Sequence, residues 1–354
     1  MRIVSEDFFK QFKCIAGECP CTCCSGWQIM IDDASLEKYE NYDGKIKANV
    51  NNSIDWLEGS FLQCENGDCA FLNENKLCDL ILAEGDGMLC DTCRNYPRHV
   101  EEYEDLREWS MSLSCPEVAH IINSLDTFSL DITDNDEEDP LEDEFEDFDL
   151  ILFDKLLESR EVMFKILRDR SFALKVRVGL CLELAGRLQE LYDSDETFMM
   201  DDVIEEFKDA KALKAMAEEC EVSFAGYIRN DFKVFDELER LSDDFDDFIS
   251  VIESYPYSEA DNEKQREVAL ENILVSLLYT YYLGAIYNGM ITAYTEMCVF
   301  IMVVVDALSL AKSEKYGRAL TDKEFEEVIY RVSREIEHSD ININTILEYF
   351  DLQA

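Results

Sequence analysis

The sequence predicts a mainly α protein in which an irregular Cys-rich, metal-binding N-terminal module packs on an α-helical C-terminal domain. Only 13 glycines and 5 prolines occur among 354 residues, and long stretches consist of helix-forming residues. Hydrophobic residues make up 47% of the chain, which is enough for a sizeable core. Eleven of the 14 cysteines lie before residue 124. We therefore predict a module over residues 1–124, an acidic linker or loop over residues 125–149, and a helical domain over residues 150–354.

The N-terminal part opens with "CIAGECPCTCCSGW", residues 14–27, which holds five cysteines in fourteen positions. The preceding segment "MRIVSEDFFKQFK" has no apolar core of signal-peptide length, which predicts a cytoplasmic protein with reduced thiols. Disulfides are therefore not expected. Thiolates bind zinc and iron–sulfur clusters well, and ligands in short loops lose little chain entropy when they converge. The cysteines predict a metal or cluster site, and their spacing leaves open which thiols share a centre.

Other cysteines and the histidines add less. The pair Cys90 and Cys93 has the C-x-x-C spacing that holds one centre from a turn, but the usual pair of C-x-x-C knuckles is absent, so a simple zinc ribbon is not expected. His99 and His120 lie near cysteines and are further candidate ligands, although exposed histidines are the more common case. The three late cysteines stand alone in helical patterns and are expected to be small buried hydrophobic residues. They are Cys181, Cys220 and Cys298.

The predicted linker, Asp126 to Asp149, is acidic at 13 of its 24 positions and is interrupted by Pro140. Charge repulsion and few aliphatic residues predict a linker or mobile loop there. Beyond it, "FALKVRVGLCLELAGRLQEL" carries apolar residues at the spacing of one helix face. These residues are Leu174, Val178, Cys181, Leu182, Ala185 and Leu188. A long apolar segment from Glu271 to Lys312 predicts two buried helices broken near Asn288 and Gly289.

The charge balance restricts the partners. The chain has 79 acidic and 32 basic residues, a net charge of −47, so nucleic acid and anionic membrane surfaces are not expected partners. A basic or lysine-bearing protein would be attracted, although such acidity also occurs as a solubility adaptation. The longest apolar run, Met297 to Val305, is too short to cross a bilayer and predicts a buried helix. No G-x-G-x-x-G or P-loop sequence occurs, so a Rossmann-type enzyme is not expected.

Several blocks in order resemble the flagellin lysine-N-methylases. "FKCIAGECPCTCCSGWQIMID" is similar to the opening cysteine block of that family, and "CAFLNENKLCDL" to its second block. "GMLCDTCRNYPR" and "LSCPEVA" are similar to the T-C-R-x-Y-P-R and S-C-P-E-x-A blocks. "ILRDRSFALKVRVGLCLELAGRLQE" and "ENILVSLLYTYYL" look like family helices, so the resemblance spans most of the chain.

The resemblance implies transfer of methyl groups from S-adenosylmethionine to lysine side chains of flagellin or a similar surface protein. It also implies an iron–sulfur cluster, 4Fe–4S being the expected type and zinc the alternative. By the matching positions, the implied metal ligands are Cys14, Cys19, Cys23, Cys24, Cys69, Cys78, Cys93 and Cys115. Cys21, Cys64 and Cys90 fall outside the family pattern. Eight thiols are enough for two four-ligand centres, or for one centre and structural cysteines.

The block "CRNYPR" places Arg94 and Arg98 beside an implied ligand in a very acidic chain. Arginine forks match carboxylates, so both residues are candidates for holding the carboxylate of S-adenosylmethionine. The alternative is that they neutralise thiolate charge or pair with local acids. Trp27 is expected to anchor a core, with Gly26 allowing a tight bend, and Glu117 is expected to be an acid at the start of a helix.

Two functions remain open at this point. The first is a cytoplasmic protein-lysine methyltransferase with an iron–sulfur centre. The second is a non-enzymatic protein that binds zinc or a cluster and uses its helices as an interaction module. The absence of a nucleotide-binding loop and of an obvious catalytic base favours the second, whereas the ordered cysteine blocks favour the first.

Overall fold

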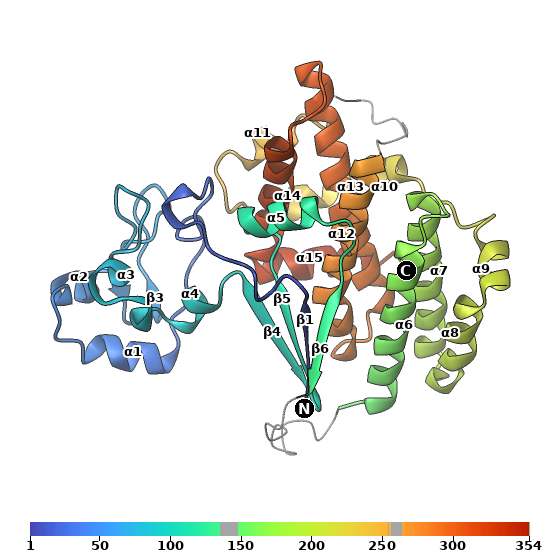
Figure 1. The fold of residues 1–354 in the computed structure, drawn as a ribbon, viewed down its shortest axis with the longest axis horizontal. Coiled ribbons are helices and arrows are strands. Elements are labelled where there is room, and N and C mark those ends of the chain that lie inside the picture. Colours follow the sequence, from blue (N-terminus) through green and yellow to red (C-terminus); the bar gives the residue numbers. More distant parts are fainter. Residues whose placement is uncertain (135–147, 254, 256–263, 354) are drawn as a thin grey trace.

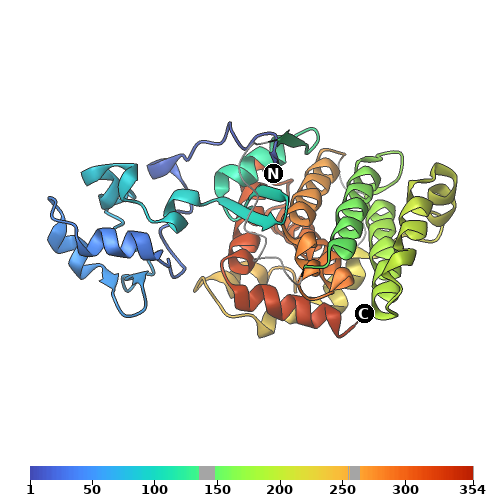
Figure 2. The ribbon, with the colours of Figure 1, turned by 90° about the horizontal axis from the view of Figure 1, so that it is seen from below.

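The protein consists of a small Cys-rich part at one end, a helical body at the other and a four-stranded sheet against the body (Figure 1). The computed structural model describes residues 1–134, 148–253, 255 and 264–353. Seen from below, the Cys-rich part and the helical body lie side by side along the long axis of the molecule (Figure 2). The predicted mainly helical class is confirmed, and the sheet is an addition that the sequence did not predict.

The sheet has the strand order β4-β5-β1-β6. Its strands are β1 (Arg2–Glu6), β4 (Arg98–Tyr103), β5 (Leu106–Met111) and β6 (Leu130–Asp134). β1 runs parallel to β5 and antiparallel to β6, and β4 and β5 form a hairpin. The helix α5 (Pro116–Ser124) follows β5, with Glu117 in its first turn as expected. The prediction of an irregular N-terminal part missed these strands because the partners of β1 lie more than a hundred residues away.

Residues 13–97 form the Cys-rich part as an insertion between β1 and β4. Its elements are short: η1 (Ala16–Glu18), α1 (Asp33–Glu40), α2 (Lys47–Asn52), β2 (Ile54–Asp55), β3 (Ser60–Phe61), α3 (Asp79–Glu84), η2 (Asp86–Met88) and α4 (Asp91–Asn95). A separate small core holds them together, built from Ile29, Ile31, Tyr39, Val50, Ile54, Phe61, Cys69, Phe71, Leu80, Met88 and Cys90. The strands and α5 belong instead to the main core, which they share with the helices.

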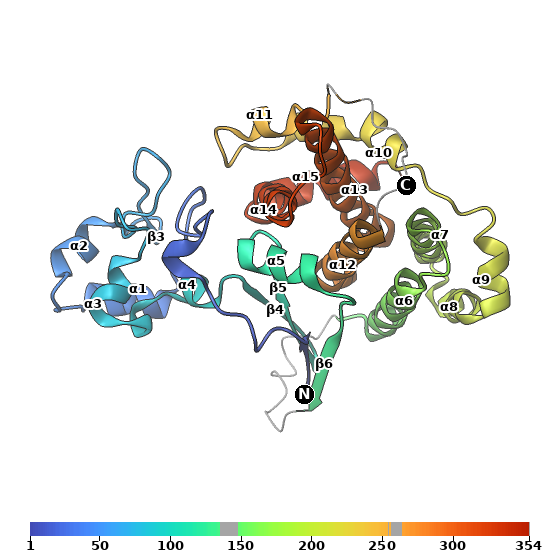
Figure 3. The same cartoon turned by 45° about the horizontal axis from the view of Figure 1, so that its top comes forward.

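The helical body is built around α13 (Ile291–Tyr316), which is buried along most of its length. Figure 3 shows α13 at the centre of this body, and α7, α12, α14 and α15 all pack against it. A helix that is apolar on all sides belongs in the interior of a protein. The longer surrounding helices are α6 (Leu150–Arg168), α7 (Leu174–Asp193), α12 (Lys264–Tyr281), α14 (Asp322–Glu337) and α15 (Asp340–Asp351).

Shorter elements complete the body. They are η4 (Thr197–Met199), α8 (Met200–Lys208), α9 (Ala210–Met216), α10 (Phe224–Asn230), η5 (Phe232–Glu237), α11 (Phe245–Ile249) and η6 (Tyr282–Ile286). The predicted face of α7 is confirmed, with Leu182 only partly buried and Leu184 buried in addition. The predicted break near Asn288 and Gly289 is also confirmed, since α13 begins just beyond it.

Two helices are long and apolar enough to span a membrane by length and composition, Arg266–Ile286 and Ile291–Tyr316. The prediction that the apolar run at residues 297–305 is too short to span a membrane considered only that run. The helix that contains it is 26 residues long. In their most apolar windows, 78% and 83% of the residues are buried inside the protein. This burial is typical of the core helices of a folded domain.

The first part of the predicted acidic linker is structured. Phe128 is buried, and Leu130–Asp134 form the edge strand β6, in which Leu130 is partly buried and Ile132 exposed. β6 thus packs on the main core at Leu130, whereas residues 131–133 are exposed. Residues 135–147, the most acidic part of that prediction, lie outside the described residues.

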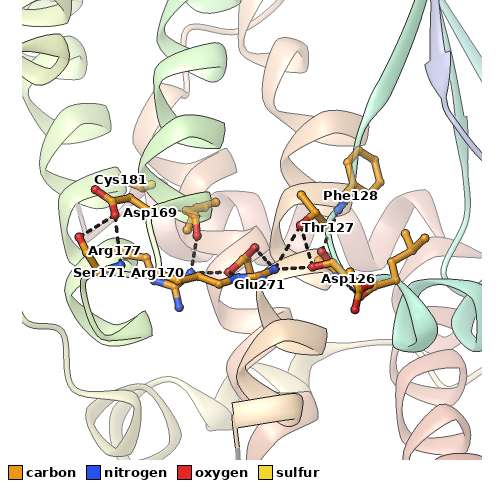
Figure 4. Close-up of polar contacts among 12 residues, drawn as sticks. Asp126, Thr127, Phe128, Asp169, Arg170, Ser171, Arg177, Cys181 and Glu271 are labelled. Atoms are coloured by element: carbon orange, nitrogen blue, oxygen red, sulfur yellow. Dashed lines mark hydrogen bonds and ion pairs between the residues drawn. The ribbon is translucent and has the colours of Figure 1, made fainter.

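A buried charge cluster joins α7, α12 and the segment before β6 (Figure 4). The Glu271 carboxylate accepts a hydrogen bond from Arg177 at 2.5 Å and two from Arg170 at 2.9 Å. Arg177 and Glu271 are each 1% exposed, and Arg170 also donates to the Asp126 carbonyl. Burying ions is costly, and the cost is offset only when each charge keeps its partner. Glu271 therefore connects α12 to α7 through Arg177, and to the segment before β6 through Arg170.

We predict that Glu271→Gln destabilises the protein by about 3–5 kcal/mol, because it leaves the buried Arg177 cation without a counter-charge. The free energy of unfolding in urea measures the change. Glu205→Gln is the matched control, since it removes an exposed partner of Lys208 and should change stability by no more than about 0.5 kcal/mol. Equal losses in the two variants would contradict the assigned role of Glu271.

Candidate functional site: a thiol-lined cavity between the two cores

A cavity of about 460 Å³ lies where the Cys-rich part meets the main body. One wall comes from residues of the body, including Phe12, Pro116 and Glu117. The opposite wall comes from η1, the loop before Trp27, α3 and the segment around α4. Eight cysteines line it: Cys14, Cys19, Cys21, Cys23, Cys24, Cys78, Cys93 and Cys115. Thiols from four separate segments of the chain therefore face one space.

The structure places the implied metal ligands in and beside this cavity. Seven of the eight line it, and Cys69 lies behind the wall in the small core, where its backbone N–H donates to the Cys24 carbonyl at 2.7 Å. Among the cysteines outside the family pattern, Cys21 lines the cavity, Cys90 is buried next to Cys93, and Cys64 is exposed. All fourteen cysteines are free thiols.

The thiols fall into two neighbourhoods according to which ones repel each other when ionised. Among the implied ligands, the first set consists of Cys14, Cys19, Cys23 and Cys115, and the second of Cys24, Cys69, Cys78 and Cys93. Cys21 also repels Cys19, and Cys64 and Cys90 repel members of the second set. The adjacent residues Cys23 and Cys24 connect the two sets. Four thiols are the usual ligand number of a zinc site or of a 4Fe–4S cluster.

Burial dominates the electrostatics of these thiols. It raises the pKa of Cys69 and of Cys115 to about 12, because a thiolate is poorly solvated there. The Cys23 thiol donates a hydrogen bond to Cys24 and so lowers the pKa of Cys24 to about 7. Cys93 donates in the same way to Cys90 and lowers its pKa. Burial thus favours the protonated form of Cys19, Cys78 and Cys115, and a metal ion bound there would have to displace their protons.

The donor set suits a soft metal centre, but the ligands are not closed around a point. Among the described residues, no three histidine, cysteine, aspartate or glutamate side chains lie close enough to hold one metal ion. The chemistry of the wall nevertheless fits, since reduced thiols from the module and the body face the same cavity. The metal centre therefore stays a proposal.

The two arginines implied in donor binding differ in their surroundings, although both line the cavity. Arg94 donates to the Asp91 carboxylate at 2.9 Å and to the Leu89 carbonyl at 2.7 Å. The Arg98 guanidinium lies over the rings of Phe9 and Phe12, 5.3 and 5.1 Å from their centres. In the described part of the chain no carboxylate pairs with Arg98, which leaves its fork available to an anion.

The two candidate histidine ligands lie away from the cavity wall. His99 contacts Glu101 at 2.6 Å, and His120 contacts Glu326 at 2.8 Å, which raises the pKa of His120. These contacts are typical of surface histidines paired with acids.

Helix α14 holds the cysteine segment from behind. Arg334 donates to the carbonyl groups of Thr22, at 2.9 Å, and Ser25, more than three hundred residues earlier in the chain. Arg334 is buried, and no carboxylate among the described residues pairs with it. The hydrogen bond from Cys23 lowers the pKa of Cys24 most, and burial opposes it. Thr22 and the charge of Arg334 lower this pKa further. A buried cation therefore stands beside the thiols.

Aromatic contacts complete this junction. The Trp27 indole donates to the Cys23 carbonyl at 2.7 Å and packs on the His338 ring with centres 4.6 Å apart. Tyr96 contacts both rings, and Gly26 has the positive φ of 82° that its bend requires. Trp27 thus anchors the contact between module and body, in keeping with the predicted role.

Comparison with known proteins fits this arrangement. The FliB lysine N-methylase C-terminal domain matches residues 160–353, which is more than half of the chain. The chain belongs to this family. No solved structure matches it. The FliB domain begins within α6 and includes α14, so it supplies Arg334 and His338, whereas every cysteine of the cavity lies before it.

Curated relatives share part of the chain. The flagellar biosynthetic protein FliU of Salmonella muenchen is 31% identical over 137 residues, 36% of this chain and 81% of FliU. The lysine-N-methylases of Salmonella typhimurium and Salmonella choleraesuis are also 31% identical over 137 residues. The matched part spans only 34% of each of these two methylases.

Sequence analysis of this FliB-family chain missed the residues behind the cavity. Arg334 and His338 belong to no recognisable sequence motif, because their contacts join the end of the chain to its beginning. The helical pattern of α14 showed only which positions are buried. Ser112 and Ser114 come just before α5 in the block "SLSCPE", but only the fold shows what they contact.

We predict that Arg334→Ala loosens the cysteine segment, because two carbonyl groups lose a charged donor, which is about 1.5–3 kcal/mol per bond. Alkylation of Cys23 and Cys24 by iodoacetamide, followed by mass spectrometry, should become faster. Arg331→Ala is the matched control on the same helix, since it removes a pair with the exposed Asp244. Unchanged alkylation in Arg334→Ala would show that Arg334 does not hold the segment.

Proposed function

We propose that this FliB-family protein is a protein-lysine N-methyltransferase. It transfers methyl groups from S-adenosylmethionine to lysine side chains of flagellin or a similar lysine-bearing protein, in the cytoplasm. An iron–sulfur cluster, with 4Fe–4S the expected type, is held by thiols of the cavity. The observation that carries the proposal is one cavity that combines thiols, the cation Arg98 and apolar walls.

Charge and burial suit the acceptor. A chain of net charge −47 attracts lysine-rich partners over long range. Inside the cavity, apolar walls that include Phe12, Ile15, Leu77 and Pro97 disfavour the charged ammonium form. Only the neutral amine has the lone pair that methylation needs, so partial desolvation of the lysine promotes the reaction.

Arg98 suits the methyl donor. S-adenosylmethionine carries an α-carboxylate, which an arginine fork binds through two parallel hydrogen bonds. Arg98 is the arginine of the cavity wall that lacks a carboxylate partner among the described residues, whereas Arg94 already pairs with Asp91. Holding the donor by its carboxylate leaves the sulfonium methyl group to be aimed at the amine.

The transfer itself is a displacement at carbon. The amine lone pair forms the new C–N bond while the C–S bond breaks, and its electron pair stays on sulfur. The ammonium proton must leave before or during this step. The chain contributes orientation, exclusion of water and an acceptor for that proton.

The cluster is proposed at the first thiol set, Cys14, Cys19, Cys23 and Cys115. All four line the cavity, and Cys115 is the member that belongs to the main core. When bound, the cluster supplies iron that joins the thiolates of the module and the body, so its binding energy also stabilises their contact.

We predict that protein purified without oxygen contains iron and acid-labile sulfide and methylates co-expressed flagellin. Intact-mass spectra should show additions of whole methyl groups that depend on S-adenosylmethionine. Cys115→Ser should lose most of the iron, because one ligand of the cluster is gone. Cys64→Ser is the control, since its thiol is exposed and off the cavity.

The metal analysis and the assay test separate parts of the proposal. Colourless protein with stoichiometric zinc would exclude the cluster and favour a structural metal. Iron-loaded protein that never methylates flagellin or lysine-rich peptides would exclude the methyltransferase activity.

We further predict that Arg98→Ala weakens binding of S-adenosylmethionine at least about tenfold, since a charge-assisted hydrogen bond contributes about 1.5–3 kcal/mol. Arg98→Lys should recover only part of the affinity because lysine lacks the planar fork. Calorimetric titration measures both. Arg94→Ala is the comparison, and an equal loss there would contradict the assignment of the carboxylate to Arg98.

A further inference from the structure

A row of hydroxyl groups leads from the cavity wall to a carboxyl group in the helical body. Tyr96 lines the cavity, and its hydroxyl lies 3.0 Å from Ser114 Oγ. Ser114 Oγ in turn forms a hydrogen bond with Ser112 Oγ. Ser112 Oγ then donates to Glu337 Oε2 at 2.6 Å. Every step between the cavity and the carboxyl group is thus a hydrogen bond between side chains.

The carboxylate sets the direction of these bonds. Because Ser112 donates to Glu337, its oxygen is free to accept from Ser114, and Ser114 accepts from Tyr96. His338 Nε2 lies 2.9 Å from Ser114 Oγ and completes its partners. Burial lowers the pKa of His338 to about 3, so the ring stays neutral and is not the end of the row.

Glu337 is suited to exchange a proton near neutral pH. Burial of its carboxyl raises its pKa to about 7, although hydroxyl groups of Ser112, Ser333 and Tyr281 and the charge of His99 lower it. The Cys298 thiol on α13 also faces it. A carboxyl group with such a pKa is present in both forms at neutral pH.

We propose that the Tyr96 hydroxyl accepts the ammonium proton of a lysine bound in the cavity and that Glu337 stores it. This inference rests on the proposed methyltransferase function. It assigns the acid–base role to Glu337, at the end of the row of hydrogen bonds, rather than to the carboxylates Asp86 and Glu117 of the cavity wall. Glu337 acts through the hydroxyl groups and is therefore a positioning and proton-storing residue, whereas Tyr96 faces the substrate.

Protons and charges balance along the row. The N–H bond of the ammonium breaks and a new O–H bond forms on Tyr96, whose own proton moves to Ser114 Oγ. The Ser114 proton moves to Ser112 Oγ, and the Ser112 proton moves to Glu337. The result is a neutral amine in the cavity and a neutral carboxylic acid in the body. After methylation, the acid returns its proton to solvent.

Three variants interrupt the row at different points. Tyr96→Phe keeps the ring that packs on Trp27 and His338 and removes only the hydroxyl. Ser112→Ala removes the donor to the carboxylate, and Glu337→Gln replaces the carboxyl with an amide of the same shape. Glu335→Gln is the matched control, since Glu335 is also buried on α14 but accepts from the Leu241 N–H and has no link to the cavity.

The measurement is the pH profile of methyl transfer to a lysine peptide at saturating S-adenosylmethionine. In the wild type the rate should rise as Glu337 loses its proton near pH 7. In Tyr96→Phe, Ser112→Ala and Glu337→Gln the rate at neutral pH should fall about a hundredfold. Their profiles should move toward the lysine pKa of about 10.4, since lysine must then ionise unaided. Binding of S-adenosylmethionine should be unchanged, and Glu337→Asp should restore part of the rate.

A second measurement needs no activity. Infrared spectra across the pH range should show a carboxylic acid signal that titrates near neutrality in the wild type and is missing in Glu337→Gln. Its presence in Glu337→Gln would overturn the storage of a proton at Glu337.

The outcomes of the activity assay separate the two claims. Methyl transfer with wild-type profiles in the three variants would overturn the proton path alone. Absence of methyl transfer by the wild type would overturn the proposed function, and with it the path as a route for a lysine proton. Equal loss in Glu335→Gln would show that the effect is structural.

Discussion

The buried charge of Arg334 is the constraint on which the junction between the two parts of the protein depends. In the described structure, two backbone carbonyls of the cysteine segment accept from its guanidinium, and no carboxylate balances it. An isolated buried cation is costly, so carbonyl dipoles and ionised thiols nearby are favoured in compensation. The same interaction thus fixes the position of the segment and adds to the lowering of the pKa of Cys24, against the burial that raises the pKa of most neighbouring thiols.

The two parts of the chain contribute different residues to this junction. The insertion at residues 13–97 carries most of the cavity thiols, and Arg98 follows it at the start of β4. The FliB domain carries α14, the helix that holds the cysteine segment. Neither part forms the cavity alone. Trp27 and His338 meet at the contact, and the row of hydroxyl groups crosses it as well. The thiol-bearing wall and the buried Glu337 carboxyl are therefore brought together by the same few contacts.

Local patterns predicted the parts of the structure that depend on neighbours in the sequence. The face of α7 followed from apolar spacing, and the break followed from Asn288 and Gly289 in the sequence. In the structure Gly289 has a positive φ of 75°. β1 was missed because its partner strand lies far along the chain. The sequence showed the cysteines as one group. It did not show that Arg98 differs from Arg94, because the pairing of Arg94 with Asp91 is a property of the fold. Arg334 and Glu337 gave no local signal, since their partners are elsewhere in sequence.

The position of the insertion also determines an order of assembly. β1 pairs with β5 and β6, both of which follow the whole Cys-rich part in the chain. On a ribosome, all of residues 13–97 emerge before the first strand can find a partner. The small core around Phe61 and Phe71 consists of residues close in sequence, which close short loops quickly. The thiols of residues 13–97 are thus outside the ribosome before the helical body exists to cover them.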